Sequence, residues 1–204
     1  MILPLMKILA FTDVHASEKA MEHLREKSRD ADILVCCGDL TTFGRELSFY
    51  LEQLDSFGKE VLIVHGNHED SDEVEALCAT LPNLTFIHER VIKRNGITFI
   101  GFGGGGFSEH EIDFGIFASE HEDELQFPII FVTHAPPRDC RLDCLPIGNV
   151  GVYEYREFID TFHPVFSVFG HLHEFAGEED RIGETVIINP GPTGRFLTFP
   201  QTKA

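Results

Sequence analysis

The stretch of sequence that decides the fold is Val61-Leu-Ile-Val-His65-Gly66-Asn67-His68-Glu69. Its first four residues are apolar, which is typical of a strand covered on both faces. Gly66 allows the backbone to turn sharply, and an amide, an imidazole and a carboxylate then follow in consecutive positions. The stretch therefore predicts a buried strand that ends in reactive side chains.

Four other apolar runs end in side chains of the same kinds. The runs are residues 7–11, 33–37, 129–133 and 165–169. The polar residues that follow them are, in order, Asp13 with His15, Asp39, His134, and His171 with His173. Ligands of open α/β sheets bind beyond the carboxyl ends of the strands, so we expect the five endings to converge on one site.

The spacing of apolar residues predicts an α/β fold. Residues 17–30, 47–54 and 72–81 carry apolar side chains at helical spacing, and each of these segments lies between two strands. This alternation predicts parallel strands joined by right-handed crossovers. Asn95-Gly96 separates two strand-like runs and predicts a hairpin. The other expected elements are strands at 85–88, 91–94, 97–102, 185–188 and 195–199 and a short helix at 153–161.

We expect residues 1–204 to form one domain, because the reactive residues extend from Asp13 to His173 and leave no room for a second core. Residues 103–106 are four glycines without a following Lys-Ser/Thr pair or helix start, which predicts a turn and not a phosphate-binding loop. Residues 108–126 predict a long acidic loop, and our hypothesis is that it closes over the site as a lid. We expect substrate specificity to lie in this loop and in residues 135–152.

The chain has 204 residues and a net charge of −18, which disfavours extended nucleic acid as a partner because an acidic surface repels phosphate backbones. No apolar run is long enough to span a membrane, and the N-terminus lacks the basic region and cleavage site of a signal peptide. Cys140 and Cys144 leave open a disulfide or an accessory metal, although two free thiols are favoured. These features predict a cytoplasmic protein.

The reactive residues form a set of metal-binding donors. Asp13 and His15 are spaced i, i+2, as are His171 and His173, and in an extended chain this spacing puts both side chains on one side. The full set is Asp13, His15, Asp39, Asn67, His134, His171 and His173. These mixed oxygen and nitrogen donors suit Mn, Fe, Co, Ni or Zn better than Ca or Mg. Seven ligands exceed what one tetrahedral ion needs and fit two ions that share a carboxylate.

With these blocks in view, the sequence resembles the calcineurin-like metallophosphoesterase superfamily. The family pattern of Asp-X-His, Gly-Asp, Gly-Asn-His-Asp/Glu, a later His and Gly-His-X-His is present in full and in the same order. It stands here as Asp13-Val-His15, Gly38-Asp39, Gly66-Asn67-His68-Glu69, Thr133-His134 and Gly170-His171-Leu-His173. The resemblance implies two mixed β-sheets packed as a sandwich and flanked by helices.

The resemblance also implies roles for single residues. Asp13, His15, Asp39 and His173 would hold the first metal, and Asp39, Asn67, His134 and His171 the second, with Asp39 as the bridge. His68 would act as general acid near the leaving group, and Glu69 would hold the His68 imidazole and favour its charged form. The implied reaction is hydrolysis of a small phosphodiester or phosphomonoester by attack of a metal-bridging hydroxide. The implied cofactors are two divalent metal ions, with manganese as the first choice and iron, nickel, zinc or cobalt as alternatives.

Departures from the family pattern reduce the number of phosphoesterase subclasses that the sequence fits. Asp39 is followed by Leu40-Thr41-Thr42-Phe43 and not by the Val-Asp-Arg-Gly of Ser/Thr protein phosphatases, which disfavours that assignment. Two rival functions stay open: a non-catalytic scaffold of this fold, as in the retromer subunit, and a nuclease acting with a partner. A homodimer also stays open. Arg138, Arg141 and Arg195 are expected either to meet a phosphate or to form surface ion pairs.

The remaining histidines lack motif context. His65 ends a strand and could lie beside the site. The others are expected at the surface or on helices: His23, His88, His110, His121 and His163.

Overall fold

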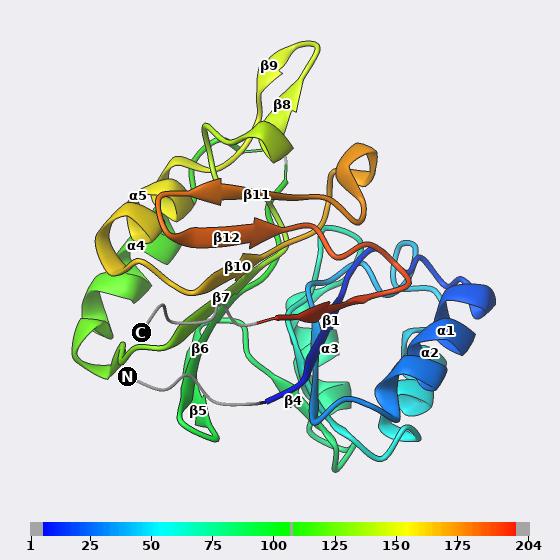
Figure 1. The fold of residues 1–204 in the computed structure, drawn as a ribbon. Helices are drawn as coiled ribbons and strands as arrows, with labels where there is room; N and C mark the ends of the chain where they lie inside the picture. The colour runs from blue at the N-terminus through cyan, green and yellow to red at the C-terminus, as the bar shows by residue number, and fades with distance from the viewer. Residues whose placement is uncertain (1–5, 107, 199–204) are drawn as a thin grey trace.

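The computed structural model describes residues 6–106 and 108–198, and it has two mixed β-sheets packed face to face between helices (Figure 1). The first sheet has the strand order β13-β1-β2-β3-β4 and the second has the order β11-β12-β10-β7-β6-β5. Both are parallel in the middle, and β13, β5 and β11 add antiparallel strands at their edges. The expected α/β sandwich is confirmed.

The first sheet and its helices follow the predicted alternation. Its strands are β1 (Ile8–Phe11), β2 (Ile33–Cys36), β3 (Glu60–Ile63), β4 (Leu84–Phe86) and β13 (Arg195–Leu197). The helices are α1 (Glu18–Ser28), α2 (Leu47–Asp55) and α3 (Ser71–Cys78). The side chain of Ser17 accepts a hydrogen bond from the backbone of Ala20 and so caps α1. Strands β1 to β4 pair in parallel, as expected for β-α-β units.

The second sheet contains the predicted hairpin. Its strands are β5 (Arg90–Arg94), β6 (Ile97–Phe102), β7 (Ile129–Thr133), β10 (Phe166–Val168), β11 (Glu179–Ile182) and β12 (Thr185–Ile188). Strands β5 and β6 pair antiparallel around Asn95-Gly96. A small separate hairpin is formed by β8 (Cys144–Leu145) and β9 (Gly148–Asn149). The predicted end of the last strand at Phe199 lies outside the described residues, as do residues 1–5.

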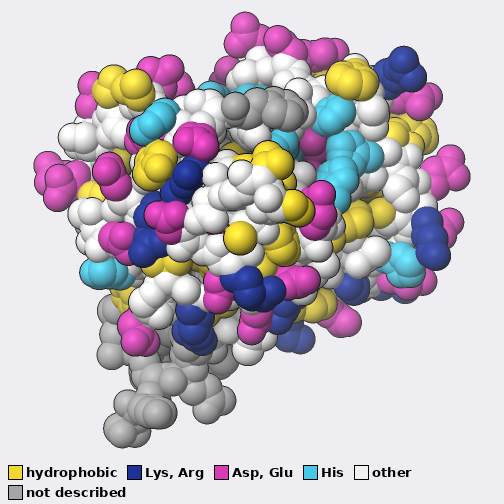
Figure 2. All heavy atoms as spheres, turned by 90° about the horizontal axis from the view of Figure 1, so that it is seen from above, with side chains coloured by type: hydrophobic (Ala, Val, Ile, Leu, Met, Phe, Trp, Pro, Cys, Tyr) yellow, Lys and Arg dark blue, Asp and Glu magenta, His cyan; other side chains and the backbone are white. Residues whose placement is uncertain are grey.

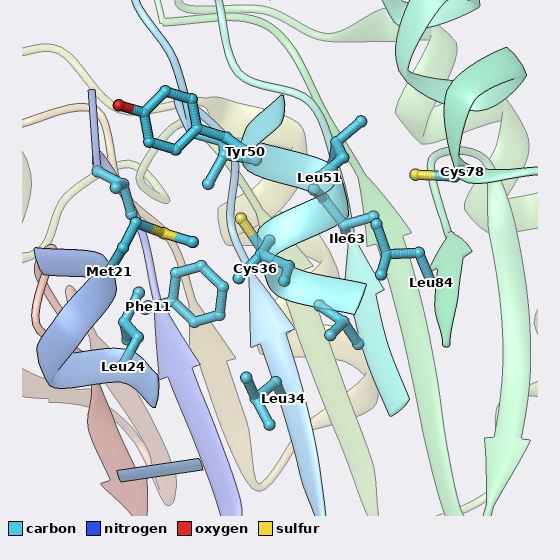
Figure 3. Close-up of a cluster of buried hydrophobic side chains, with 14 of the residues drawn as sticks. Phe11, Met21, Leu24, Leu34, Cys36, Tyr50, Leu51, Ile63, Cys78 and Leu84 are labelled. Carbon is cyan, nitrogen blue, oxygen red and sulfur yellow. The ribbon is translucent and has the colours of Figure 1, made fainter. Parts of the chain in front are cut away.

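The alternation of side chains along the strands builds the layers. Leu9 and Phe11 of β1 pack with the helices α1 and α2, in the cluster that Figure 3 shows. Ile8 and Ala10 of the same strand point to the other face and pack against the second sheet. A third cluster lies between the second sheet and its outer helices. The layers are therefore helix, sheet, sheet, helix.

The prediction of a long loop at residues 108–126 is wrong, because the segment contains the helix α4 (Ile112–Glu120). Phe114, Phe117 and Ala118 lie at helical spacing and are buried. The Phe114 ring stacks on Phe131 of β7, with 5.0 Å between the ring centroids. Helix α4 therefore belongs to the outer helical layer with α5 (Tyr153–Phe162), and the lid hypothesis is wrong for it.

None of the helices in the described part of the chain has the length and apolar character needed to cross a bilayer. All five cysteines are free, so the two thiols of Cys140 and Cys144 form no disulfide.

Candidate metal centre

The seven predicted metal ligands lie at the carboxyl ends of strands from both sheets. Asp13 and His15 follow β1, Asp39 follows β2 and Asn67 follows β3 in the first sheet. His134 follows β7, and His171 and His173 follow β10 in the second sheet. The backbone N–H of His171 lies 3.1 Å from each carboxylate oxygen of Asp13, which joins the two sheets at this point. Figure 2 shows histidine side chains grouped on the face seen from above, with acidic side chains close by.

Asp13, His15 and His173 form the first group of donors. The Nε2 atoms of His15 and His173 are 3.0 Å apart, and Nε2 of His173 is 3.5 Å from Oδ1 of Asp13. Two ligands at right angles on one ion, each about 2.1 Å from it, lie about 3.0 Å apart. The spacing therefore matches atoms that share a cation. The side chain of His173 is 60% exposed, so this group opens to solvent.

Asn67, His134 and His171 form the second group. Oδ1 of Asn67 lies 2.9 Å from Nε2 of His134 and 2.8 Å from Nδ1 of His171. His134 is fully buried, so this group lies deeper in the protein than the first.

Asp39 lies between the two groups. Its Oδ2 atom is 3.4 Å from Nε2 of His134 and 3.8 Å from Nε2 of His15. Its Oδ1 atom accepts a hydrogen bond of 3.0 Å from the backbone N–H of His68. This bond fixes the carboxylate, and it leaves Oδ2 facing one histidine of each group.

The backbone fixes the ring orientation of two of the histidines. Nδ1 of His15 lies 3.2 Å from the carbonyl oxygen of Thr41, and Nδ1 of His134 lies 2.9 Å from that of Cys37. A carbonyl oxygen only accepts, so each Nδ1 carries a proton and each neutral ring presents the lone pair of Nε2 to the centre. Histidines that bind metals are oriented in this way.

These lone pairs face oxygen atoms that also lack a proton. A cation would relieve the repulsion between them, so the donor set fits divalent metal ions. Burial alone would lower the pKa of His134, but a protonated Nε2 could donate a hydrogen bond to Asp39, and this bond and the Asp39 charge raise the pKa. Burial acts to raise the pKa of Asp39, and the same pairing with His134 lowers it. The pair thus attracts positive charge, which either a proton or a metal ion can supply.

The local backbone around the site is strained. Asp13, His15, Asp39 and His171 all have positive φ angles, of 53°, 47°, 51° and 66°. Left-handed conformations are costly for residues other than glycine and cluster at functional sites. The motif glycine Gly66 is required by close approach, because a Cβ there would lie 2.0 Å from Oδ1 of Asp39.

Glu69 does not hold the His68 imidazole, and the expectation that it does is wrong. Its carboxylate is buried and accepts hydrogen bonds from the backbone N–H groups of Asp39, Thr41 and Gly66 and from the Thr41 hydroxyl. Burial raises the pKa of Glu69, although the bonds from Thr41 and Gly66 oppose this. Glu69 therefore joins the turns after β2 and β3 and so positions Asp39.

We expect Glu69→Gln to destabilise the protein by about 1–3 kcal/mol, because the glutamine NH₂ group leaves buried N–H donors without an acceptor. Urea unfolding monitored by circular dichroism measures this change. Glu52→Gln, at an exposed position on α2, is the matched control and should leave the unfolding midpoint unchanged. Equal midpoints for both variants would contradict the positioning role of Glu69.

His68 lies beside Asp39 at the edge of the site. Its Nε2 atom is 3.9 Å from Oδ2 of Asp39, and its Nδ1 atom accepts a hydrogen bond of 3.2 Å from the backbone N–H of Phe43. A neutral ring held in this way carries its proton on Nε2, on the side of the donors. The sequence contained no signal for the contact with Phe43, because a backbone donor leaves no mark in side-chain composition.

The three candidate arginines form ion pairs with glutamates and do not extend to the donors. Arg138 Nη1 lies 3.0 Å from Glu109 Oε1. Arg141 pairs with Glu178 and Arg195 with Glu179. Arg141 and Arg195 thus form the expected surface ion pairs, whereas the Arg138 side chain is only 14% exposed and also lies over the Tyr153 ring.

His65 and His88 lie together under the glycine-rich turn. Their rings meet edge to face, with 4.7 Å between centroids, and a Cβ on Gly103 would lie 2.6 Å from Nδ1 of His65. Burial, with the nearby His88 and His134, lowers the pKa of His65 to about 4. His88 is half-buried, so its expected place at the surface is wrong. The glycines form a closely packed turn, as predicted.

The sandwich fold and its oxygen and nitrogen donors define an α/β protein with a candidate two-metal centre at the strand ends. Comparison with family models is more specific: the chain belongs to the calcineurin-like phosphoesterase family, whose model matches residues 6–175.

Individual proteins are similar to the chain in sequence or in fold. The chain is 32% identical to the uncharacterized protein MJ1162 of Methanocaldococcus jannaschii, over 94% of this chain and 91% of the relative. Its fold is similar to that of TT1561 of Thermus thermophilus, with a TM-score of 0.76 at 17% identity, over 93% of this chain and 91% of that one. It is also similar to a dimetal phosphatase from Danio rerio, with a TM-score of 0.58 at 12% identity, over 91% and 87% of the two chains.

Proposed function

We propose that this protein is a metal-dependent phosphoesterase that hydrolyses a small phosphodiester or phosphomonoester. The observation that carries the proposal is the position of Asp39 Oδ2, which faces His15 from one donor group and His134 from the other. Family membership supports the reaction class, and the dimetal phosphatase of similar fold supports a two-ion site.

Two ions held by these donors would neutralise the phosphate and lower the pKa of a water molecule that attacks it. Manganese is our first choice of metal, with iron, nickel, zinc or cobalt as alternatives, because the donors mix oxygen and nitrogen. We propose that Asp13, His15, His173 and Asp39 hold the first ion. Asp39, Asn67, His134 and His171 would hold the second.

His68 is the proposed general acid. Its Nε2 proton lies on the side of the donors, where it can be given to the leaving oxygen while Nδ1 stays bound to the N–H of Phe43. Proton donation of this kind contributes about 10²–10⁴-fold to a rate. Glu69 accepts a hydrogen bond from the backbone N–H of Asp39, and its proposed role is to position Asp39.

A substrate panel tests the proposal. The purified protein is incubated with Mn²⁺ and with bis(p-nitrophenyl) phosphate, p-nitrophenyl phosphate, cyclic nucleotides, nucleoside monophosphates, and single- and double-stranded DNA. We expect hydrolysis of a small ester that stops with EDTA and returns with Mn²⁺. Metal binding without hydrolysis of any compound would refute the proposal in favour of a scaffold, and cleavage of DNA alone would favour a nuclease. A cytoplasmic location and a homodimer stay predictions.

A further inference from the structure

Phe43 is an exposed aromatic residue at the edge of the candidate site. It lies in the turn between β2 and α2, and its ring packs against the His68 ring with 4.5 Å between centroids. Although its backbone N–H is bonded to His68, 74% of the residue is exposed. The phenyl ring therefore contributes little to the hydrophobic core.

The backbone of Phe43 is also unfavourable for its side chain. Its φ angle is +53°, a left-handed conformation that is a genuine outlier for a bulky residue. Gly44, the next residue, has a φ of +67°, so the same turn already contains a glycine, which adopts the left-handed conformation without strain. A glycine at position 43 would also keep the N–H that His68 accepts. Burial does not explain the phenyl ring, and backbone geometry opposes it.

An exposed ring that lies next to the proposed acid, on a backbone conformation that disfavours it, points to a ligand. We propose that the Phe43 ring packs against the leaving group of the substrate and that this leaving group contains an aromatic ring. This inference rests on the proposed function, because it places the leaving group at His68. The net charge of −18 adds that an uncharged leaving group is favoured over an anionic one.

Aromatic selectivity is the property that a stacking residue would confer. Stacking of a flat ring on an aromatic side chain is lost when the side chain is truncated, and the change corresponds to about tenfold or more in binding. An aliphatic leaving group of similar size gains much less from the same ring. The ratio of hydrolysis or binding for an aromatic compound to that for an aliphatic one therefore reports on Phe43. This ratio is independent of metal loading and of the acid.

The test compares benzyl and butyl compounds in the Mn²⁺-loaded protein. Hydrolysis is measured with benzyl and butyl phosphate, as monoesters and as their methyl diesters, and binding is measured by calorimetry with benzylphosphonate and butylphosphonate. We expect Phe43→Leu to lower the benzyl-to-butyl ratio about tenfold in both assays, and Phe43→Trp to retain it. Phe49→Leu, a second exposed phenylalanine on α2, is the control and should leave the ratio unchanged.

Phe43→Gly separates a structural role from a binding role. It relieves the left-handed conformation, so we expect a melting temperature equal to or above that of the wild type, together with loss of benzyl selectivity. Hydrolysis with an unchanged ratio in Phe43→Leu would overturn this inference and leave the proposed function standing. Absence of hydrolysis would overturn the proposed function, and the phosphonate ratios would then decide whether Phe43 binds an aromatic ligand.

Discussion

Asp39→Asn is expected to abolish metal-dependent hydrolysis and to reduce the metal content of both positions. The Oδ2 atom of Asp39 faces Nε2 of His15 and Nε2 of His134, so one substitution affects both donor groups. An amide at this place carries no charge, and one of its orientations directs N–H groups at the ions. Partners that only orient metal ligands contribute about 10–100-fold, and we expect a shared ligand to exceed that range.

Metal content by plasma mass spectrometry and hydrolysis of the best ester in the panel measure this effect. Asp160→Asn, at an exposed position on α5, makes the same chemical change away from the site and should behave like the wild type. Two bound ions with a wild-type rate in Asp39→Asn would show that Asp39 is not a shared ligand, and the two-metal proposal would fail with it.

His68→Ala is expected to lower kcat by about 10²–10⁴-fold while both metal ions stay bound. Nε2 of His68 lies 3.9 Å from Asp39 Oδ2 at the edge of the site, and its side chain is partly exposed. His68 can also be grouped with His15 and Asp39 as potential metal donors, which is a competing role. Equal loss of metal and of turnover in His68→Ala would favour that competing role.

The leaving group gives a second measure of the same role. A nitrophenolate departs without a proton, whereas an alkoxide requires one, so the loss in His68→Ala should be much larger for alkyl esters than for p-nitrophenyl esters. The ratio of the two losses depends on proton donation and not on metal affinity. Equal losses for both kinds of ester would contradict the role of His68 as general acid.

Much of the fold was predictable because its signals are local. The spacing of apolar residues predicted β1 to β3 and the helices between them, Asn95-Gly96 predicted the β5–β6 hairpin, and the structure confirms these elements. The loop prediction failed at α4, where Phe114, Phe117 and Ala118 lie at helical spacing among the many acidic residues of 109–124. The spacing was the better guide, because burial of an apolar stripe stabilises a helix whatever its exposed face carries.

The same distinction between local and non-local signals holds for the candidate site. Asp13, His15, Asp39, Asn67, His134, His171 and His173 could be selected from the sequence, because each follows a predictable strand in a spaced motif. The hydrogen-bond partner of a side chain was not predictable where that partner is a backbone group. Glu69 binds N–H groups and not His68, and His68 is held by the N–H of Phe43.

The sequence by itself determined the kinds of atoms at the strand ends and the order of the strands that carry them, because side-chain chemistry and hydrophobic period are properties of short segments. Only the tertiary structure decided that Oδ2 of Asp39 lies between the two donor groups, that three arginines pair with glutamates, and that Phe43 is exposed beside His68. Those contacts join residues from different strands and turns, and their geometry depends on how the two sheets pack and on the left-handed turns that follow them.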